Sequence, residues 1–144
     1  MMWCDMTKHI MIIDDEPDFR YSAGIALRKA GYKISEADNG RNALALILNA
    51  QKMDEHFDLL LIDMRMPEMS GMELIEELKK SNISVPIFVI SAYVHSALFK
   101  ELQSKGCSEF LQKPFEPEEM VRRVENILEE NNNPLKKKGE RIWE

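Results

Sequence analysis

The chain has 144 residues, of which 44% are hydrophobic and 31% are charged, and its formal net charge is −6 at pH 7. This length suits one domain with a buried core, and the acidic balance argues against nucleic acid as a direct partner of the domain. No apolar stretch approaches the roughly 20 residues of a membrane span, and no basic and apolar leader begins the chain. We therefore expect a cytoplasmic protein in which Cys4 and Cys107 stay reduced.

Five short apolar segments predicted to be strands alternate with five predicted helices. In chain order, the elements are a strand over 8–14, a helix over 17–30, a strand over 32–37, a helix from 40, a strand over 57–63, a helix after Ser70, a strand from 86, a helix over 93–105, a strand over 107–111 and a helix from 117. Strict alternation is typical of a parallel sheet with helices on both faces. We expect an α/β protein with the flavodoxin-like, doubly wound (βα)5 fold, strand order 2-1-3-4-5, and the least apolar second strand nearer an edge.

Local signals place one helix start and the end of the domain. Ser70 and Glu73 have the spacing of a capping box, in which each side chain binds the backbone N–H of the other residue. The alternating pattern stops after Asn131, where polar and basic residues follow. We therefore expect one domain over residues 8–131 and a C-terminal tail or linker over 132–144.

Polar side chains suited to chemistry lie at the ends of four predicted strands. Asp14 and Asp15 follow the first strand, Asp63 ends the third, Ser91 ends the fourth, and Lys113 follows the fifth. The carboxyl ends of parallel strands share one edge, so these groups are expected to meet there. Three clustered carboxylates favour a hard divalent cation such as Mg²⁺, and a carboxylate can attack phosphorus to form an acyl phosphate. The cation, the ammonium and the hydroxyl could then hold the phosphoryl oxygens.

Each of these residues also has an explanation without function. An acidic pair after a strand is often a helix N-cap, an aspartate can cap a loop, a serine can simply end a strand, and a lysine is most often solvated. Four such coincidences at one edge of one sheet are much less expected than one. Their joint placement therefore favours a chemical site.

Four segments of the sequence resemble the receiver domain of bacterial two-component response regulators, the family that includes the chemotaxis regulators. The segments are Asp14-Asp15-Glu16, Asp63 to Gly71, Ser91-Ala92 and Lys113-Pro114-Phe115. They occur in the family's order and spacing, and the resemblance covers about Lys8 to Glu130. It implies a phosphoacceptor that takes a phosphoryl group from a sensor histidine kinase or a histidine phosphotransfer protein. It also implies no enzymatic activity beyond promoting its own phosphorylation and dephosphorylation.

The resemblance implies a role for each acidic residue. Asp63 would be the phosphoacceptor. Asp15, Asp63 and the backbone carbonyl of Arg65 would ligate Mg²⁺ directly, and Asp14 would act largely through water.

The resemblance also implies how phosphorylation would be transmitted. Lys113 would pair with the phosphoryl group through a cis peptide bond to Pro114, and Ser91 would hydrogen-bond the group and swing inward. Phe110 matches the family's aromatic switch, which is often tyrosine. The fourth helix, fifth strand and fifth helix would form the partner-binding face, with a homodimer as one possible outcome. An effector domain in a longer parent chain is a further possible partner.

Other functions fit the same residues less well. A Mg²⁺-dependent phosphatase or phosphotransferase with an aspartyl nucleophile needs an acid two residues after that nucleophile, where this chain has Arg65. An NTPase needs a Gly-x-x-x-x-Gly-Lys-Ser/Thr loop, which the sequence lacks. A pure interaction module would not need the acidic set with Ser91 and Lys113. A phosphate relay or phosphate sink without its own output stays open as an alternative.

Overall fold

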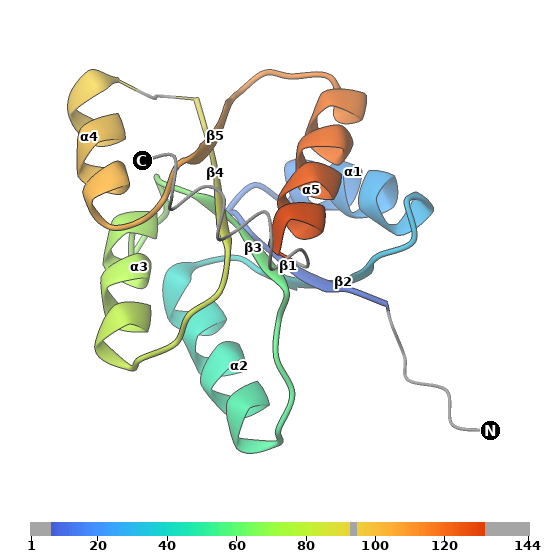
Figure 1. Ribbon diagram of the computed structural model, residues 1–144. Helices are drawn as coiled ribbons and strands as arrows, with labels where there is room; N and C mark the ends of the chain where they lie inside the picture. Colours follow the sequence, from blue (N-terminus) through green and yellow to red (C-terminus); the bar gives the residue numbers. More distant parts are fainter. Residues whose placement is uncertain (1–6, 93–94, 132–144) are drawn as a thin grey trace.

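The computed structural model describes residues 7–92 and 95–131 of the chain. Within these residues, five strands alternate with five helices, as the sequence predicts (Figure 1). The elements are β1 (His9–Ile13), α1 (Pro17–Lys29), β2 (Lys33–Ala37), α2 (Gly40–Lys52), β3 (Leu59–Asp63), α3 (Gly71–Lys80), β4 (Ile87–Ser91), α4 (Ser96–Ser104), β5 (Glu109–Gln112) and α5 (Pro117–Asn131). The predicted tail over 132–144 lies outside the described residues, so the expected domain limits stay a prediction.

The strands form one parallel sheet in the order β2-β1-β3-β4-β5. This confirms the predicted fold class and strand order, and it confirms the edge position of β2. All five residues of the central strand β3 are buried, because helices cover both of its faces. The carboxyl ends of β1, β3 and β4 are therefore neighbours along one edge of the sheet.

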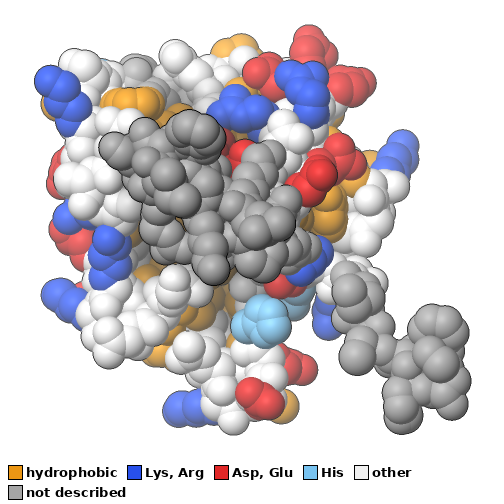
Figure 2. Space-filling view, viewed as in Figure 1, with side chains coloured by type: hydrophobic (Ala, Val, Ile, Leu, Met, Phe, Trp, Pro, Cys, Tyr) orange, Lys and Arg blue, Asp and Glu red, His pale blue; other side chains and the backbone are white. Residues whose placement is uncertain are grey.

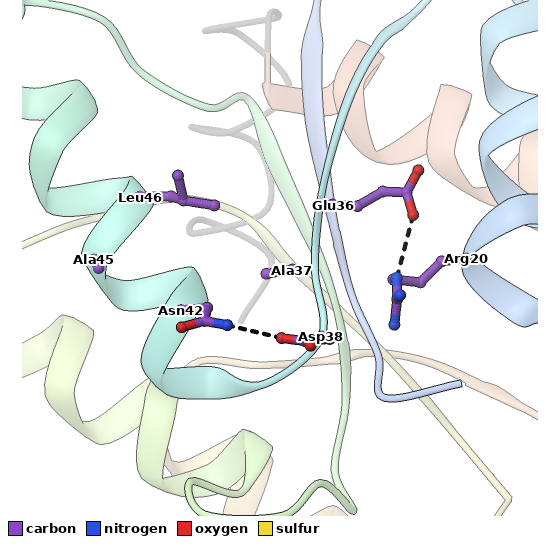
Figure 3. Close-up of a pocket in the computed structure, with 7 residues that line it drawn as sticks. All are labelled: Arg20, Glu36, Ala37, Asp38, Asn42, Ala45 and Leu46. Carbon is purple, nitrogen blue, oxygen red and sulfur yellow. Dashed lines mark hydrogen bonds and ion pairs between the residues drawn. The ribbon is translucent and has the colours of Figure 1, made fainter. Parts of the chain in front are cut away.

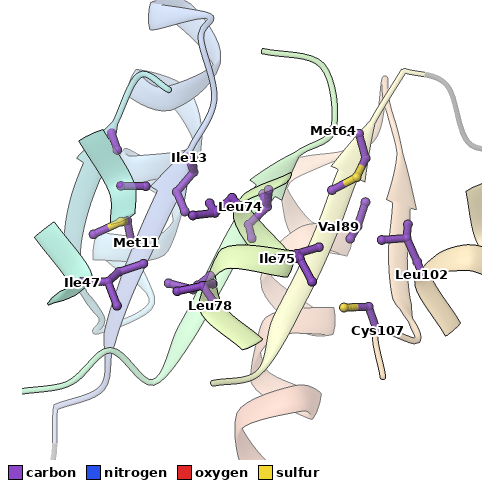
Figure 4. Packing of buried hydrophobic residues seen from close by; sticks show 14 residues of the cluster. Met11, Ile13, Ile47, Met64, Leu74, Ile75, Leu78, Val89, Leu102 and Cys107 are labelled. Atoms are coloured by element: carbon purple, nitrogen blue, oxygen red, sulfur yellow. The ribbon is translucent and has the colours of Figure 1, made fainter. Parts of the chain in front are cut away.

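Side chains on the two faces of the sheet form two separate hydrophobic clusters, because successive residues of a strand point to opposite faces. Met11, Leu60 and Val89 face α2, α3 and α4 in one cluster, which also contains Cys107 (Figure 4). The other cluster joins the alternate strand residues, including Phe88, to α1 and α5. Figure 1 shows these two groups of helices on opposite sides of the sheet.

The structure shifts the predicted fifth strand toward the C-terminus. The sequence indicates a strand over 107–111, whereas β5 spans Glu109–Gln112. Gly106 has a positive φ of 85°, and the N–H of Cys107 donates to the carbonyl of Leu102 at 2.9 Å. Cys107 therefore helps to close α4 and does not begin the strand. As a result, β5 ends directly before Lys113.

Two of the predicted helix starts have different outcomes. The capping box of α3 is confirmed: Ser70 Oγ accepts the N–H of Glu73, and Glu73 Oε1 accepts the N–H of Ser70. The fourth helix, expected to start near residue 93, begins at Ser96, and residues 93 and 94 lie outside the described part of the chain. His95 is its N-cap, with extended backbone and an Nδ1 atom that accepts the N–H of Leu98 at 3.3 Å.

The surface carries charges of both signs. Among the described residues on the face in Figure 2, basic and acidic side chains are interspersed, and hydrophobic side chains show only in small areas. In the two described stretches of the chain, no helix combines the length and the apolar character that crossing a membrane requires.

Candidate functional site

The polar groups predicted at the strand ends do lie at the carboxyl edge of the sheet. Asp63 is the last residue of β3, Ser91 is the last residue of β4, and Asp14 directly follows β1. Their exposed fractions are 6%, 1% and 0%, although all three side chains are polar. Burial of a carboxylate costs free energy unless other groups or ions compensate its charge. The edge of the sheet therefore carries a concentrated and unusual set of buried polar groups.

Three carboxylates gather at this edge. Asp14, Glu16 and Asp63 each offer a carboxylate oxygen, and these oxygens lie within 4.8 Å of one another. Oxygen donors of this kind suit a hard cation such as Mg²⁺, which typically binds one or two carboxylates and retains water. The donor set therefore fits the predicted cation.

The structure and the sequence analysis differ in the third carboxylate of this group. Glu16 belongs to it, and sequence reasoning missed that residue. Asp15 is exposed and lies outside the group of three, but its charge also acts on Asp63. The only sequence signal for Glu16 is its place beside the acidic pair. The turn after β1 decides which carboxylate faces the edge, and no periodicity reports that turn. The direct role expected of Asp15 stays a prediction.

Lys113, which follows β5, contacts the same acidic group at the carboxyl edge of the sheet. Its Nζ donates to Asp14 Oδ2 at 2.7 Å and to Glu16 Oε1 at 2.9 Å, and 14% of its side chain is exposed. Burial alone would lower the pKa of Lys113, but the hydrogen bonds to Asp14 and Glu16, together with the charges of Asp14 and Asp63, raise the pKa above its ordinary value. The ammonium is therefore charged at neutral pH.

The two buried aspartates resist ionisation. Burial, helped by the nearby charge of Asp14 and opposed by Lys113, raises the pKa of Asp63 to about 6. Burial also raises the pKa of Asp14, against the hydrogen bond from Lys113. One ammonium thus compensates three carboxylates only in part. A cation at this edge would favour the ionised forms that a nucleophilic carboxylate needs.

The loop after β3 folds closely over Asp63. The backbone N–H of Arg65 points at Asp63 Oδ1 across 3.5 Å, and the N–H of Gly71 donates to the carbonyl of Met64 at 3.2 Å. A Cβ atom at Gly71 would lie 2.6 Å from the carbonyl oxygen of Asp63 and 2.5 Å from the Met64 side chain. Only glycine lets α3 start so near the end of β3. The proposed role of the Arg65 carbonyl as a ligand stays a prediction.

Backbone pairing links Ser91 to Lys113. The N–H of Lys113 donates to the carbonyl of Ser91 at 2.8 Å, which extends the ladder between β4 and β5. The Lys113-Pro114 peptide bond is cis, as the resemblance implies. Both residues therefore lie at the edge that carries Asp63, whereas their contacts with a phosphoryl group stay predictions.

Phe110 lies inside the face expected to respond to phosphorylation. Its ring packs on the ring of Phe99 from α4, with centroids 4.6 Å apart and planes at 32°. Arg123 of α5 donates from Nη2 to the Phe110 carbonyl at 2.7 Å. The half-buried Phe110 thus joins α4, β5 and α5, but its role as a switch stays a prediction.

Arg20 of α1 supports the edge from the β2 side, and sequence reasoning also missed it. Its Nη1 donates to the backbone carbonyl of Asp14, and its Nε donates to Glu36 Oε1 at 3.2 Å. Arg20 and Glu36 line a groove of about 450 Å³ between α1 and α2 (Figure 3). On the other wall of the groove, Asn42 donates to Asp38 at 2.8 Å. The hydrogen bond from Arg20 to the Asp14 carbonyl therefore helps to hold the segment that carries Asp14.

Comparison with known proteins gives a consistent family. Residues 10–125 match the family described as the response regulator receiver domain. The response regulator SaeR of Staphylococcus aureus (strain USA300) is 28% identical over 122 residues, which are 83% of this chain and 50% of that protein. The chain thus spans about half the length of the curated relatives it matches.

Solved structures have the same fold. The chemotaxis protein CheY4 of Vibrio cholerae superposes with a TM-score of 0.74 at 28% identity, covering 84% of this chain and 98% of that one. The CheY-like receiver domain protein from Methanospirillum hungatei JF-1 gives a TM-score of 0.79 at 26% identity, covering 88% and 97% of the two chains. Together with the matched residues 10–125, the strand order and the acidic edge, these likenesses lead to one conclusion: the chain belongs to the family of response regulator receiver domains.

Proposed function

We propose that Asp63 accepts a phosphoryl group from a sensor histidine kinase or a histidine phosphotransfer protein. A carboxylate oxygen of Asp63 attacks phosphorus, the bond between phosphorus and the donor imidazole nitrogen breaks, and an acyl phosphate forms. The observation that carries this proposal is the burial of Asp63 at the strand edge, within 4.8 Å of two other carboxylates that can hold a cation.

The acidic residues would hold Mg²⁺ at this edge. Asp14 and Asp63 are the buried donors, and Glu16, Asp15 and the Arg65 carbonyl are the candidates to complete the set. When bound, the ion would neutralise charge that develops on the transferred phosphoryl oxygens. Its binding would also oppose the burial and the charge of Asp14 that raise the pKa of Asp63 to about 6.

Lys113 and Ser91 would receive the transferred group. The Lys113 ammonium already lies at the edge, where it donates to Asp14 and Glu16, and it would exchange a carboxylate for a phosphoryl oxygen. Ser91 is the last residue of β4, the strand beside β3, and its hydroxyl would donate to another phosphoryl oxygen. The inward movement of Ser91 would act through Phe110 on the face formed by α4, β5 and α5. A partner or a second copy of the chain would bind at that face.

The test is the mass of the intact protein after incubation with phosphoramidate or acetyl phosphate and Mg²⁺. We expect the wild-type chain to gain one phosphoryl group, and the gain to disappear in EDTA and in the Asp63→Asn variant. Asp18→Asn is the matched control, because Asp18 is an exposed acid of α1 outside the cluster. Undiminished Mg²⁺-dependent labelling of Asp63→Asn would show that another residue accepts the group.

A further inference from the structure

An aromatic ring lies against the ammonium of Lys113. Phe19 lies in the first turn of α1, and its half-buried side chain packs on the hydrophobic cluster between α1, α5 and the sheet. The Lys113 Nζ lies 4.2 Å from the centroid of the Phe19 ring. The same ring contacts Phe115 edge-on, with centroids 5.9 Å apart and planes at 87°. Phe19 therefore touches the residues on both sides of Pro114.

The two contacts of Phe19 have different physical effects. The face of an aromatic ring carries negative potential and attracts a cation within about 6 Å of its centroid. An edge-to-face pair is a preferred arrangement of two rings, so Phe115 stabilises the orientation of the Phe19 ring. Because 14% of the Lys113 side chain is exposed, water screens the attraction less than it would at an open surface.

The ring and the carboxylates make different demands on the ammonium. Asp14 and Glu16 each take one directed N–H donor of Lys113. The ring face attracts the positive charge without requiring one N–H in one direction, so this contact can survive when the ammonium exchanges a carboxylate for another oxygen. A leucine at this position would fill space without providing a negative face.

We propose that Phe19 is a positioning residue for Lys113, whose ring face keeps the ammonium at the acidic edge while it transfers from the carboxylates to the phosphoryl group on Asp63. This inference rests on the proposed phosphoacceptor function. Phe19 acts through Lys113 and does not touch the reacting atoms.

The first experiment compares Phe19→Leu with Phe19→Tyr in the rate of phosphorylation by phosphoramidate with Mg²⁺. Tyrosine keeps the aromatic face, whereas leucine removes it. We expect Phe19→Leu to react about three- to tenfold more slowly, and Phe19→Tyr to restore most of the wild-type rate. Amide spectra of both variants check that the fold is kept. A wild-type rate in Phe19→Leu, or equal slowing in both variants, would overturn the inference.

The second experiment repeats Phe19→Leu in a Lys113→Met background, which removes the charge and keeps an unbranched apolar side chain. If Phe19 acts through Lys113, the leucine substitution should cause no further slowing there. If Phe19→Leu reduces the phosphorylation rate by the same factor in both backgrounds, Phe19 has a purely structural role. If the wild-type chain takes no phosphoryl group at all, the proposed function itself fails.

A spectroscopic readout is independent of the reaction. Ring currents of Phe19 should shift the side-chain methylene resonances of Lys113 upfield, both in the metal-free protein and with Mg²⁺ and beryllofluoride. Loss of that shift on addition of beryllofluoride, in a protein that binds it, would contradict a contact that persists through transfer.

Discussion

Lys113 Nζ lies 2.7 Å from Asp14 Oδ2, although 99 positions separate the two residues in the sequence. Asp14 follows β1 and Lys113 follows β5, and the strands β3 and β4 lie between them in the sheet. The ion pair therefore reaches across the end of β3, where Asp63 lies. It connects the segment after β1 to the segment after β5, and it compensates the charge of the Asp14 carboxylate, which is fully buried.

Removing the ammonium should destabilise the metal-free protein. Lys113→Met leaves the buried Asp14 carboxylate without its cationic partner, which should lower the free energy of unfolding by about 2–4 kcal/mol. Urea unfolding in EDTA measures this change. Lys105→Met is the control, because its pair with Glu76 is more exposed and should contribute less than about 1 kcal/mol. Equal losses in the two variants would contradict a special role for the buried pair.

Neutralising Asp63 should have the opposite effect. Asp63→Asn removes, from a cluster of three carboxylates, the one whose ionised form is disfavoured by burial and by the charge of Asp14. We expect the free energy of unfolding in EDTA near neutral pH to rise by about 1–3 kcal/mol. Added Mg²⁺ should stabilise the wild-type chain more than the variant. The prediction fails if Asp63→Asn lowers the stability of the metal-free protein, or if Mg²⁺ stabilises both proteins equally.

His9, at the opposite end of β1, should make stability depend on pH. Burial lowers the pKa of His9 below its ordinary 6.5, Lys33 and His56 act in the same direction, and Asp58 and Glu55 oppose them. The unfolded chain then binds more protons than the folded chain between the lowered pKa and 6.5. The contribution of His9 is therefore fully present above 6.5 and is lost as the pH falls through its folded pKa.

The measurement for His9 is urea unfolding of the wild-type chain and of His9→Gln at several pH values. Glutamine can still bond to Ser35 Oγ, which lies 2.7 Å from the His9 Nε2 atom. The wild-type chain should lose more stability than the variant between about pH 7 and about pH 5. Parallel pH profiles would show that His9 does not contribute.

Gly71 should tolerate no side chain. A Cβ atom there would meet the backbone oxygen of Asp63, which cannot move away as a flexible side chain can. Gly71→Ala should lower the free energy of unfolding by about 1–3 kcal/mol and slow phosphorylation, because Asp63 would shift. Gly24→Ala is the control: its new atom would meet the ends of the Arg28 and Glu36 side chains and no backbone oxygen, so the helix α1 should keep or gain stability. Equal stability of the two variants would refute this account.

Much of the architecture follows from local patterns. The apolar runs that end at Asp63 and Ser91 predict strands, the spacing of Ser70 and Glu73 predicts the capping box, and alternation predicts the parallel sheet. Element ends are harder to predict, because they depend on hydrogen bonds such as that from Cys107 to Leu102. A strand pattern cannot distinguish a buried residue that starts a strand from one that closes the preceding helix.

By itself, the sequence determined the fold class, the strand order and the gathering of Asp14, Asp63, Ser91 and Lys113 at one edge. The reason is that short apolar runs and their alternation with helices predict a parallel sheet, and the carboxyl ends of parallel strands share one edge. Only the tertiary structure decided that Glu16 joins the carboxylates and that the ring of Phe19 lies against Lys113. The physical reason is that a turn after a strand can aim consecutive side chains in different directions. Contacts between α1 and the segment after β5 form only when both elements pack on the same face of the sheet.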